Sequence, residues 1–366
     1  MGCNISLLTS RLRRGQPKAM ANAHQEEGER TIRQPLHPSV RPLLDPEYVA
    51  FHDKHVQYVE PEQLRPWTPS NRTRYTWPYA GSPIVEVGNV KDIRPCGDFS
   101  IRVFSPAGPP PASGWPLLIW FHGGGFAAGN IDSDNDLCSL ACRDLECVVA
   151  NVDYRLAPEH PYPAAVEDVA AILRWATSAQ GSVALNINTA KIALGGASAG
   201  ANLAAVGALM AVELSTPIAL QVLVVPVIDN TETLGTGWSA HPHAPWLTAP
   251  RMTFYRDLYL AQSHLAMQWK ASPKFAPPEL LSRLPRTWIA IAGEDMLSTE
   301  GLEYARALAE CGVETEVRTY DGMPHTMLSL SGVLTEGQHA MQDILGVLRV
   351  AFHGPESAVL YPEREY

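Results

Sequence analysis

The chain has 366 residues, of which 46% are hydrophobic and 18% charged, as expected for a globular protein with a sizeable core. Its formal net charge of −10 excludes a broad phosphate-neutralising surface, so nucleic acid is not expected as a partner. The six cysteines form no C-x-x-C pair and no disulfide-framework spacing, and no apolar stretch reaches the length of a transmembrane helix. These features predict a cytoplasmic protein in a reducing compartment, without a metal site.

The first six residues, MGCNIS, match the N-myristoylation pattern, with Gly2 as the acceptor and Cys3 placed for a second acyl chain. Basic residues follow between positions 11 and 18 and would favour an anionic membrane surface. One acyl chain binds a protein to a membrane only marginally, whereas two such signals anchor it stably. The pattern predicts peripheral membrane contact through the N-terminus, and the alternative is an unmodified start. Residues 1–41 are otherwise polar and without periodicity, which predicts disorder.

From about residue 83 the chain alternates strand-like and helix-like segments. Alternating apolar and polar residues at 84–87 and 99–104 predict antiparallel strands with one wet face. Further strands, most of them continuous apolar runs, are predicted at 116–121, 147–152, 192–194, 220–228, 287–292 and 314–320. Helical periodicity is found at 132–145, 163–176, 299–310 and 331–350. This alternation predicts an α/β fold, a mostly parallel doubly wound sheet flanked by helices.

Two segments rich in aromatic residues and proline, at 42–82 and 229–280, do not follow this alternation of strands and helices. They predict a helical cap over the functional site. The alternative for the first is that its aromatic residues anchor an irregular segment on the core. In the second, residues 248–260 predict a helix with Thr248 as N-cap and Pro250 in the first turn. The predicted organisation is a disordered segment at 1–41, an N-terminal cap segment at 42–82, the first part of the core at 83–228, a cap insertion at 229–280, the second part of the core at 281–353 and a loose tail at 354–366.

The most informative short motif is G-x-S-x-G, formed by Gly196, Ser198 and Gly200. A strand-like run precedes it and a helical stretch of small residues follows it. A serine at such a turn adopts a strained backbone, and its neighbours must be small to make room. The alternative is an ordinary helix entry with a serine N-cap. The strand-turn-helix context favours a nucleophile.

Three polar residues follow predicted strands, in the order Ser198, Asp295, His325. Functional groups gather at the carboxyl ends of the strands in an open α/β sheet. A serine hydroxyl is a poor nucleophile until a base takes its proton, which His325 would do while Asp295 orients the ring. Glu294 is the rival acid. The order serine, acid, histidine is the one expected of an α/β-hydrolase.

Consecutive glycines follow the buried strand at 116–121, in the sequence HGGG. Backbone N–H groups can meet a developing oxyanion only where no side chain obstructs them. The predicted donors are the N–H groups of Gly124, Gly125 and Ala199, with Gly123 a weaker candidate. A phosphate-binding loop is disfavoured, since the glycines lead into neither Gly-Lys-Ser/Thr nor G-x-G-x-x-G.

Three motifs together resemble the hormone-sensitive-lipase family of esterases: His122–Phe126, Asp153–Glu159 and Gly196–Gly200. The resemblance implies an α/β-hydrolase fold with a helical cap, no cofactor, and hydrolysis of carboxylic esters. The family commonly carries Asp or Thr before the nucleophile, whereas Ala197 stands here, and this obscures the subfamily.

The same resemblance implies Ser198 as nucleophile, His325 as base and Asp295, in preference to Glu294, as the acid. We therefore expect a serine carboxylesterase that acts on short- to medium-acyl esters through an acyl-enzyme. The alternatives are acyl transfer, or lactone or amide hydrolysis, on a specialised metabolite. A non-catalytic receptor is a further alternative, although plant gibberellin receptors, which resemble the family, lack the triad histidine. We expect a monomer or a homodimer.

Overall fold

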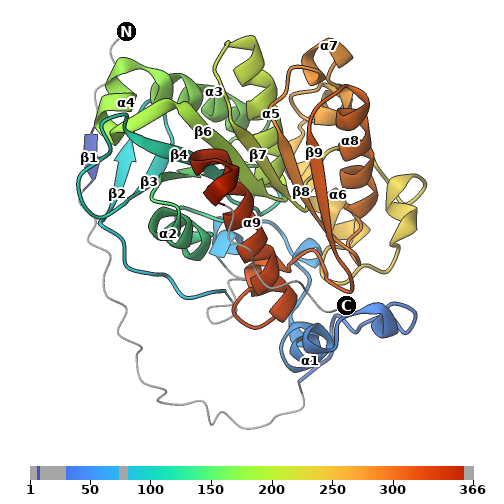
Figure 1. Cartoon of the computed structure of the whole chain (residues 1–366). Helices are drawn as coiled ribbons and strands as arrows, with labels where there is room; N and C mark the ends of the chain where they lie inside the picture. The colour runs from blue at the N-terminus through green and yellow to red at the C-terminus, as the bar shows by residue number, and fades with distance from the viewer. Residues whose placement is uncertain (1–5, 9–29, 74–80, 358–366) are drawn as a thin grey trace.

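The computed structural model describes residues 6–8, 30–73 and 81–357, so Gly2 and Cys3 lie outside the described residues. One sheet of nine strands runs through the molecule, in the order β1-β2-β3-β5-β4-β6-β7-β8-β9 (Figure 1). Its strands are β1 (Ser6–Leu8), β2 (Asn89–Arg94), β3 (Ser100–Ser105), β4 (Trp115–Phe121), β5 (Val148–Asp153), β6 (Ile187–Ala197), β7 (Leu220–Val224), β8 (Thr287–Ala292) and β9 (Thr315–Tyr320). The pairs from β1 to β5 are antiparallel, and every pair from β5 to β9 is parallel. The prediction of a mostly parallel α/β sheet is confirmed.

Helices cover both faces of this sheet. The α-helices are α1 (Pro46–Lys54), α2 (Asn135–Asp144), α3 (Ala164–Thr177), α4 (Ala179–Leu185), α5 (Ala199–Glu213), α6 (Ala249–Tyr259), α7 (Pro278–Leu281), α8 (Ser298–Glu310) and α9 (Thr335–His353). Short 3-10 helices are η1 (Arg41–Leu43), η2 (Val56–Tyr58), η3 (Glu62–Leu64), η4 (Pro69–Thr73), η5 (Gly237–Ala240), η6 (Ser263–Met267), η7 (Pro273–Phe275), η8 (Leu328–Leu330) and η9 (Pro355–Ser357). Among the described residues, none of these helices has the length and apolar character needed to cross a membrane.

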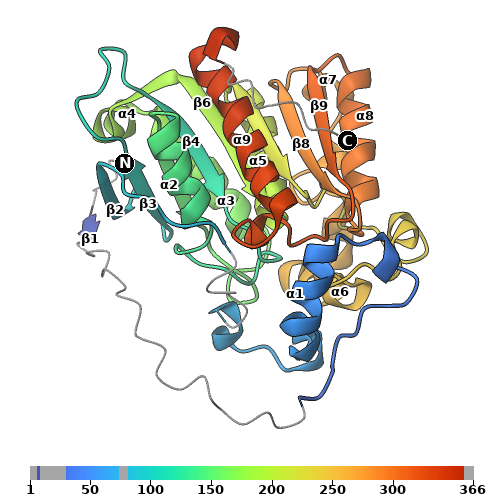
Figure 2. The ribbon, with the colours of Figure 1, turned by 60° about the horizontal axis from the view of Figure 1, so that its bottom comes forward.

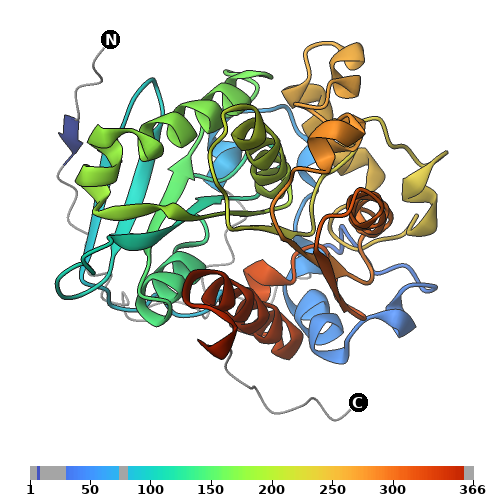
Figure 3. The same cartoon turned by 45° about the horizontal axis from the view of Figure 1, so that its top comes forward.

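Two hydrophobic cores lie on opposite faces of the sheet, because successive side chains of a strand point to opposite sides. In β4, Leu117 and Ile119 belong to the core covered by α3, α5 and α8. Leu118 and Trp120 belong to the core covered by α2 and α9. Figure 3 shows these two helical layers on either side of the strands. This explains why the central strands are apolar at every position.

Two strand predictions need correction. Residues 84–87 form no strand, and β2 begins only at Asn89. The N–H of Val85 donates instead to Ser139 Oγ of α2 at 3.1 Å, so this segment is held by a helix and not by a sheet neighbour. The strand expected at 220–228 ends at Val224, because Val225 turns the chain with a φ of 41°.

Residues of the two predicted cap segments meet beyond the carboxyl ends of the parallel strands. Figure 2 shows α1 and α6 together at this end of the molecule. Helix α6 has Thr248 at its N-cap position and Pro250 in its first turn, as expected, although the Thr248 side chain makes no capping hydrogen bond.

Residues 30–41 differ from the expected disordered segment. The side-chain carbonyl of Gln34 accepts a hydrogen bond from Arg251 of α6 at 3.0 Å. The ring of His37 stacks on His243, with centroids 3.6 Å apart. These polar residues are held by specific contacts to the cap insertion, which a composition-based expectation of disorder does not detect.

Candidate active site

Ser198 occupies the sharp turn between β6 and α5. Its φ of 57° and ψ of −117° are strained for a residue with a side chain, and such outliers cluster at functional sites. The turn is fixed by the Ser198 N–H, which donates to Val224 O of the neighbouring strand at 2.8 Å. Although Ser198 stands at the N-cap position of α5, its side chain makes no capping bond. The alternative of an ordinary serine cap is therefore excluded.

The two glycines of the motif allow the turn to pack against the end of β4. A Cβ atom on Gly200 would overlap the backbone carbonyls of Phe121 and His122. A Cβ atom on Gly196 would overlap the backbone of Gly200 itself. The spacing of the motif thus follows from a crossing of two backbones that leaves no room for side chains.

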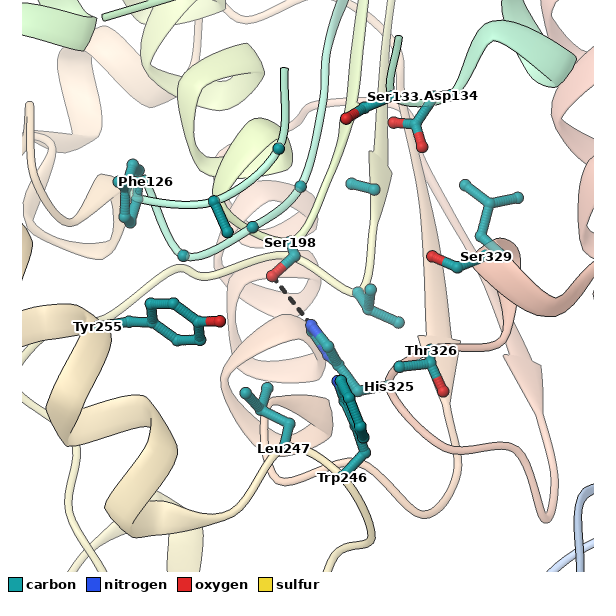
Figure 4. A pocket seen from close by; sticks show the side chains of 18 of the residues that line it. Phe126, Ser133, Asp134, Ser198, Trp246, Leu247, Tyr255, His325, Thr326 and Ser329 are labelled. Atoms are coloured by element: carbon teal, nitrogen blue, oxygen red, sulfur yellow. Dashed lines mark hydrogen bonds between the residues drawn. The ribbon is translucent and has the colours of Figure 1, made fainter. Parts of the chain in front are cut away.

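His325 lies between Ser198 and Asp295. Its Nε2 is 2.9 Å from Ser198 Oγ, the contact dashed in Figure 4, and its Nδ1 is 2.7 Å from Asp295 Oδ2. Asp295 is 1% exposed, and its Oδ1 accepts the N–H of Leu297 at 3.2 Å. A carboxylate only accepts hydrogen bonds, so Nδ1–H donates to Asp295 and Nε2 is free to accept the serine hydroxyl. The structure brings together the three residues that the sequence singled out.

The rival acid Glu294 points elsewhere. Its carboxylate lies 3.8 Å from His241 Nδ1 in the cap insertion, and burial raises its pKa. Its backbone N–H donates to Met323 O at 2.9 Å, which leaves the next residue, Asp295, to face the histidine. The structure therefore pairs His325 with Asp295.

The glycine loop after β4 lies beside the serine. A Cβ atom on Gly123 would stand 3.2 Å from Ala197 O and 3.6 Å from Ser198 Cβ. Gly124 and Gly125 both have positive φ, and the Gly124 carbonyl accepts the N–H of Ala128 at 2.8 Å within a tight turn. This turn and the first residues of α5 supply backbone N–H groups that have no acceptor within their own helix or strand. The arrangement can present several N–H groups to one oxygen.

His122 holds this loop in place through a hydrogen bond to its backbone. It is fully buried, its Nδ1 donates to Gly123 O at 2.7 Å, and its ring stacks on Tyr154 with centroids 4.5 Å apart. Tyr154 in turn donates its hydroxyl to His122 O at 2.9 Å. Burial lowers the pKa of His122 to about 4, so the ring is neutral near pH 7. The resemblance implied that Asp153–Glu159 gives structural support around the site, but the sequence could not show this contact between Tyr154 and the end of β4.

A pocket of about 760 Å³ opens above Ser198. Figure 4 shows Tyr255, Leu247 and Trp246 of the cap insertion on one side of the serine. The hydroxyl of Tyr255 donates to Glu62 of the N-terminal cap segment, so the two cap segments join across the pocket. The sequence predicted an aromatic-rich cap, but not which of its residues pair. Among the described residues, no group of three or more His, Cys, Asp or Glu side chains could hold a metal ion.

Comparison with known proteins agrees with this architecture. Residues 118–329 match the sequence family described as the alpha/beta hydrolase fold. The chain is 37% identical over 333 residues to an AB hydrolase superfamily protein of Schizosaccharomyces pombe. The aligned region covers 87% of this chain and 97% of that protein. Esterase LipI of Mycobacterium tuberculosis is 34% identical over 263 residues, 71% of this chain and 80% of that one. The solved structure of an ester hydrolase from the metagenome of Lake Arreo has a TM-score of 0.76 at 28% identity, over 84% of this chain and 99% of that one.

The chain therefore belongs to the α/β-hydrolase family. Its matching segment spans the glycine loop, the G-x-S-x-G turn, Asp295 and His325. Within that family it belongs to the hormone-sensitive-lipase group of esterases, which confirms the family expected from the motifs.

Proposed function

We propose that this protein is a serine carboxylesterase that works through an acyl-enzyme. The observation that carries the proposal is the chain of two hydrogen bonds from Ser198 Oγ through the His325 ring to Asp295. Ser198 Oγ attacks the ester carbonyl carbon while His325 Nε2 takes the hydroxyl proton. The buried carboxylate of Asp295 stabilises the imidazolium that forms. His325 then gives the proton to the departing alcohol, and water releases the acid by the same steps.

The oxyanion of the tetrahedral intermediate is stabilised by backbone N–H groups of Gly124, Gly125 and Ala199, with Gly123 as a weaker donor. The close approach of the glycine loop to Ser198 supports this assignment. Fixed donors of this kind each contribute about 3–4 kcal/mol of transition-state stabilisation in other enzymes.

The substrates we propose are short- to medium-acyl esters of small alcohols. Support comes from the pocket enclosed by the cap and from relatives named esterase, such as LipI. Acyl transfer and the hydrolysis of lactones or amides would use the same three residues, and a substrate panel distinguishes them. Peripheral membrane contact through Gly2 and Cys3 stays a prediction.

The proposal is tested by the substitution Ser198→Ala. We expect hydrolysis of p-nitrophenyl acetate and butyrate to fall by at least about 10³-fold, as when a nucleophile is removed from such a triad. Circular dichroism and the melting temperature should change little, because the strained turn accepts alanine as readily as serine. A matched control is Ser182→Ala, a half-buried serine of α4 that does not line the pocket, which should leave turnover unchanged. Turnover retained in Ser198→Ala would refute the proposal.

A further inference from the structure

The pocket has a second side, opposite the apolar residues of the cap. Figure 4 shows Ser133 and Asp134 together with Ser329 on this side, with Ser198 between them and Tyr255. We call Ser133, Asp134, Asn135 and Ser329 the polar arm, and all of them line the pocket. The apolar side and the polar arm can therefore receive chemically different ends of one ester.

Asp134 is the charged group of the polar arm. It has a left-handed backbone with φ of 55°, a conformation that aspartate adopts more readily than most residues. Its Oδ2 accepts the indole N–H of Trp120 at 2.8 Å, which fixes the carboxylate. Among the described residues, Oδ1 has no hydrogen-bond partner. Burial raises the pKa of Asp134 to about 6, so the group is ionised at neutral pH.

No cation among the described residues neutralises this carboxylate. Arg102 is already bound to Asp92 and Asp132, and the side chain of Asp132 is 70% exposed. The three arginines that line the pocket have other partners: Arg72 pairs with Glu159, Arg251 donates to Gln63 and Gln34, and Arg256 donates to backbone carbonyls. The charge of Asp134 is thus available to a bound molecule.

A second acceptor in the same wall lacks a donor. Asn135 is only 6% exposed, lines the pocket, and has no hydrogen-bond partner for its Oδ1 among the described residues. By contrast, both carboxylate oxygens of Asp136 are occupied, by the N–H groups of Leu137 and Ser82 at 2.9 and 3.0 Å. Buried acceptors without donors are rare, because each costs free energy. An incoming group that donates hydrogen bonds fits this wall.

We propose that the polar arm receives the cationic end of an ester, an amine that is protonated at neutral pH, and that Asp134 determines this specificity. The proposal rests on the proposed esterase function and narrows its substrate class. The reacting carbonyl lies at Ser198 while the ammonium group lies against Asp134. Hydrolysis itself is unchanged, since the amine stays protonated throughout.

The test compares esters that differ only by the charged atom. One pair is 2-(dimethylamino)ethyl acetate and its neutral isostere 3-methylbutyl acetate, with the charge on the alcohol. The other is p-nitrophenyl 4-(dimethylamino)butanoate and p-nitrophenyl 5-methylhexanoate, with the charge on the acyl chain. For each pair we divide kcat/KM of the charged ester by kcat/KM of its neutral isostere. We expect this ratio to be on the order of ten in the pair whose charged end enters the polar arm.

Variants then locate the effect. Asp134→Asn keeps the shape and an acceptor for Trp120 but removes the charge, and should lower that ratio about tenfold. Ser329→Lys places a cation at an exposed position of the arm and should lower the ratio too, which covers the case that Asp134→Asn fails to fold. Asp144→Asn, at the far end of α2, makes the same change of net charge and should leave the ratio unchanged.

Each other outcome overturns the proposal. A ratio of one or less in both pairs of the native protein would show that the arm does not favour a cation. An equal fall in Asp144→Asn would assign the preference to net charge alone. If native protein fails to hydrolyse even p-nitrophenyl acetate, the esterase proposal itself falls, and that result is distinct from activity without charge selectivity.

Discussion

At the scale of single residues, local sequence predicted the groups that depend on local geometry. The glycines around Ser198 are required by the crossing of two backbones, so the motif is visible in the chain itself. Asp134 carries no such signal. Its importance comes from a partner in β4 and from the absence of a described cation, and both are properties of the folded molecule. The pairing of Tyr255 with Glu62 is hidden for the same reason.

His122 should make the stability of the protein depend on pH. Its pKa is lowered to about 4 by burial, whereas an unfolded histidine has its usual value of about 6.5. The unfolded state therefore binds more protons between these values, so stability is fully present above about pH 6.5 and is lost as the pH falls toward 4. The loss reaches roughly 3 kcal/mol of unfolding free energy.

His122→Asn isolates this effect, because its side-chain amide can still donate to the Gly123 carbonyl. We expect the fall in unfolding free energy between pH 7 and pH 4.5, measured by urea denaturation, to be smaller in the variant. His160→Asn removes an exposed histidine and should leave the native pH dependence in place. An unchanged pH dependence in His122→Asn would show that His122 is protonated in the folded protein.

At the scale of elements, continuous apolar runs predicted the central strands because both of their faces are buried. Sequence pattern failed for residues 84–87, whose apolar and polar residues alternate as in a strand. This segment packs beside α2 and does not pair with a strand of the sheet. The existence of the cap was predicted from a break in the strand-helix rhythm. Its internal contacts could not be, since they join residues more than 180 positions apart.

Arg251 of α6 ties the cap insertion to the N-terminal cap segment and to the residues before it. It is 1% exposed, donates to Gln63 at 3.3 Å and to Gln34 at 3.0 Å, and lies over the Trp246 ring at 4.2 Å. Arg251→Met keeps the bulk of the chain but leaves those acceptors without a donor, at a cost of roughly 1–3 kcal/mol each. We expect a higher KM for p-nitrophenyl butyrate and faster proteolysis within the cap segments.

Arg174→Met is the matched control, since Arg174 is exposed on α3. It should change neither the KM nor the proteolytic pattern. If Arg251→Met instead destabilises the cap and the sheet equally, with cleavage spread over the whole chain, then the cap and core form one cooperative unit and Arg251 is not specific to the cap.

At the scale of the whole molecule, composition and segment order predicted the fold class, and the motifs predicted the family. Neither predicted the chemistry of the pocket. Its walls come from the glycine loop, the start of α2, both cap segments and the turns after β7 and β9, so its shape depends on how distant segments pack. The charge of the pocket is equally a sum over segments. A net charge of −10 is visible in the sequence, but the position of the Asp134 carboxylate in the wall of the pocket is not.

That net charge should attract cationic esters over distances longer than the reach of Asp134. The potential of a charged protein raises the local concentration of oppositely charged ligands, and salt screens it with a Debye length of about 30 Å at 0.01 M and about 8 Å at 0.15 M. We expect kcat/KM for the charged ester preferred by the native protein to fall roughly two- to fivefold over this range of ionic strength, while kcat/KM for its neutral isostere is unaffected.

In Asp134→Asn the preference for the charged ester is smaller, yet most of the salt dependence persists, because only one charge among a net of −10 has been removed. If Asp134→Asn abolishes the salt dependence entirely, the attraction is local to the polar arm. If kcat/KM changes equally with salt for both esters, salt acts on the enzyme itself and not on the attraction of the charged ester to it.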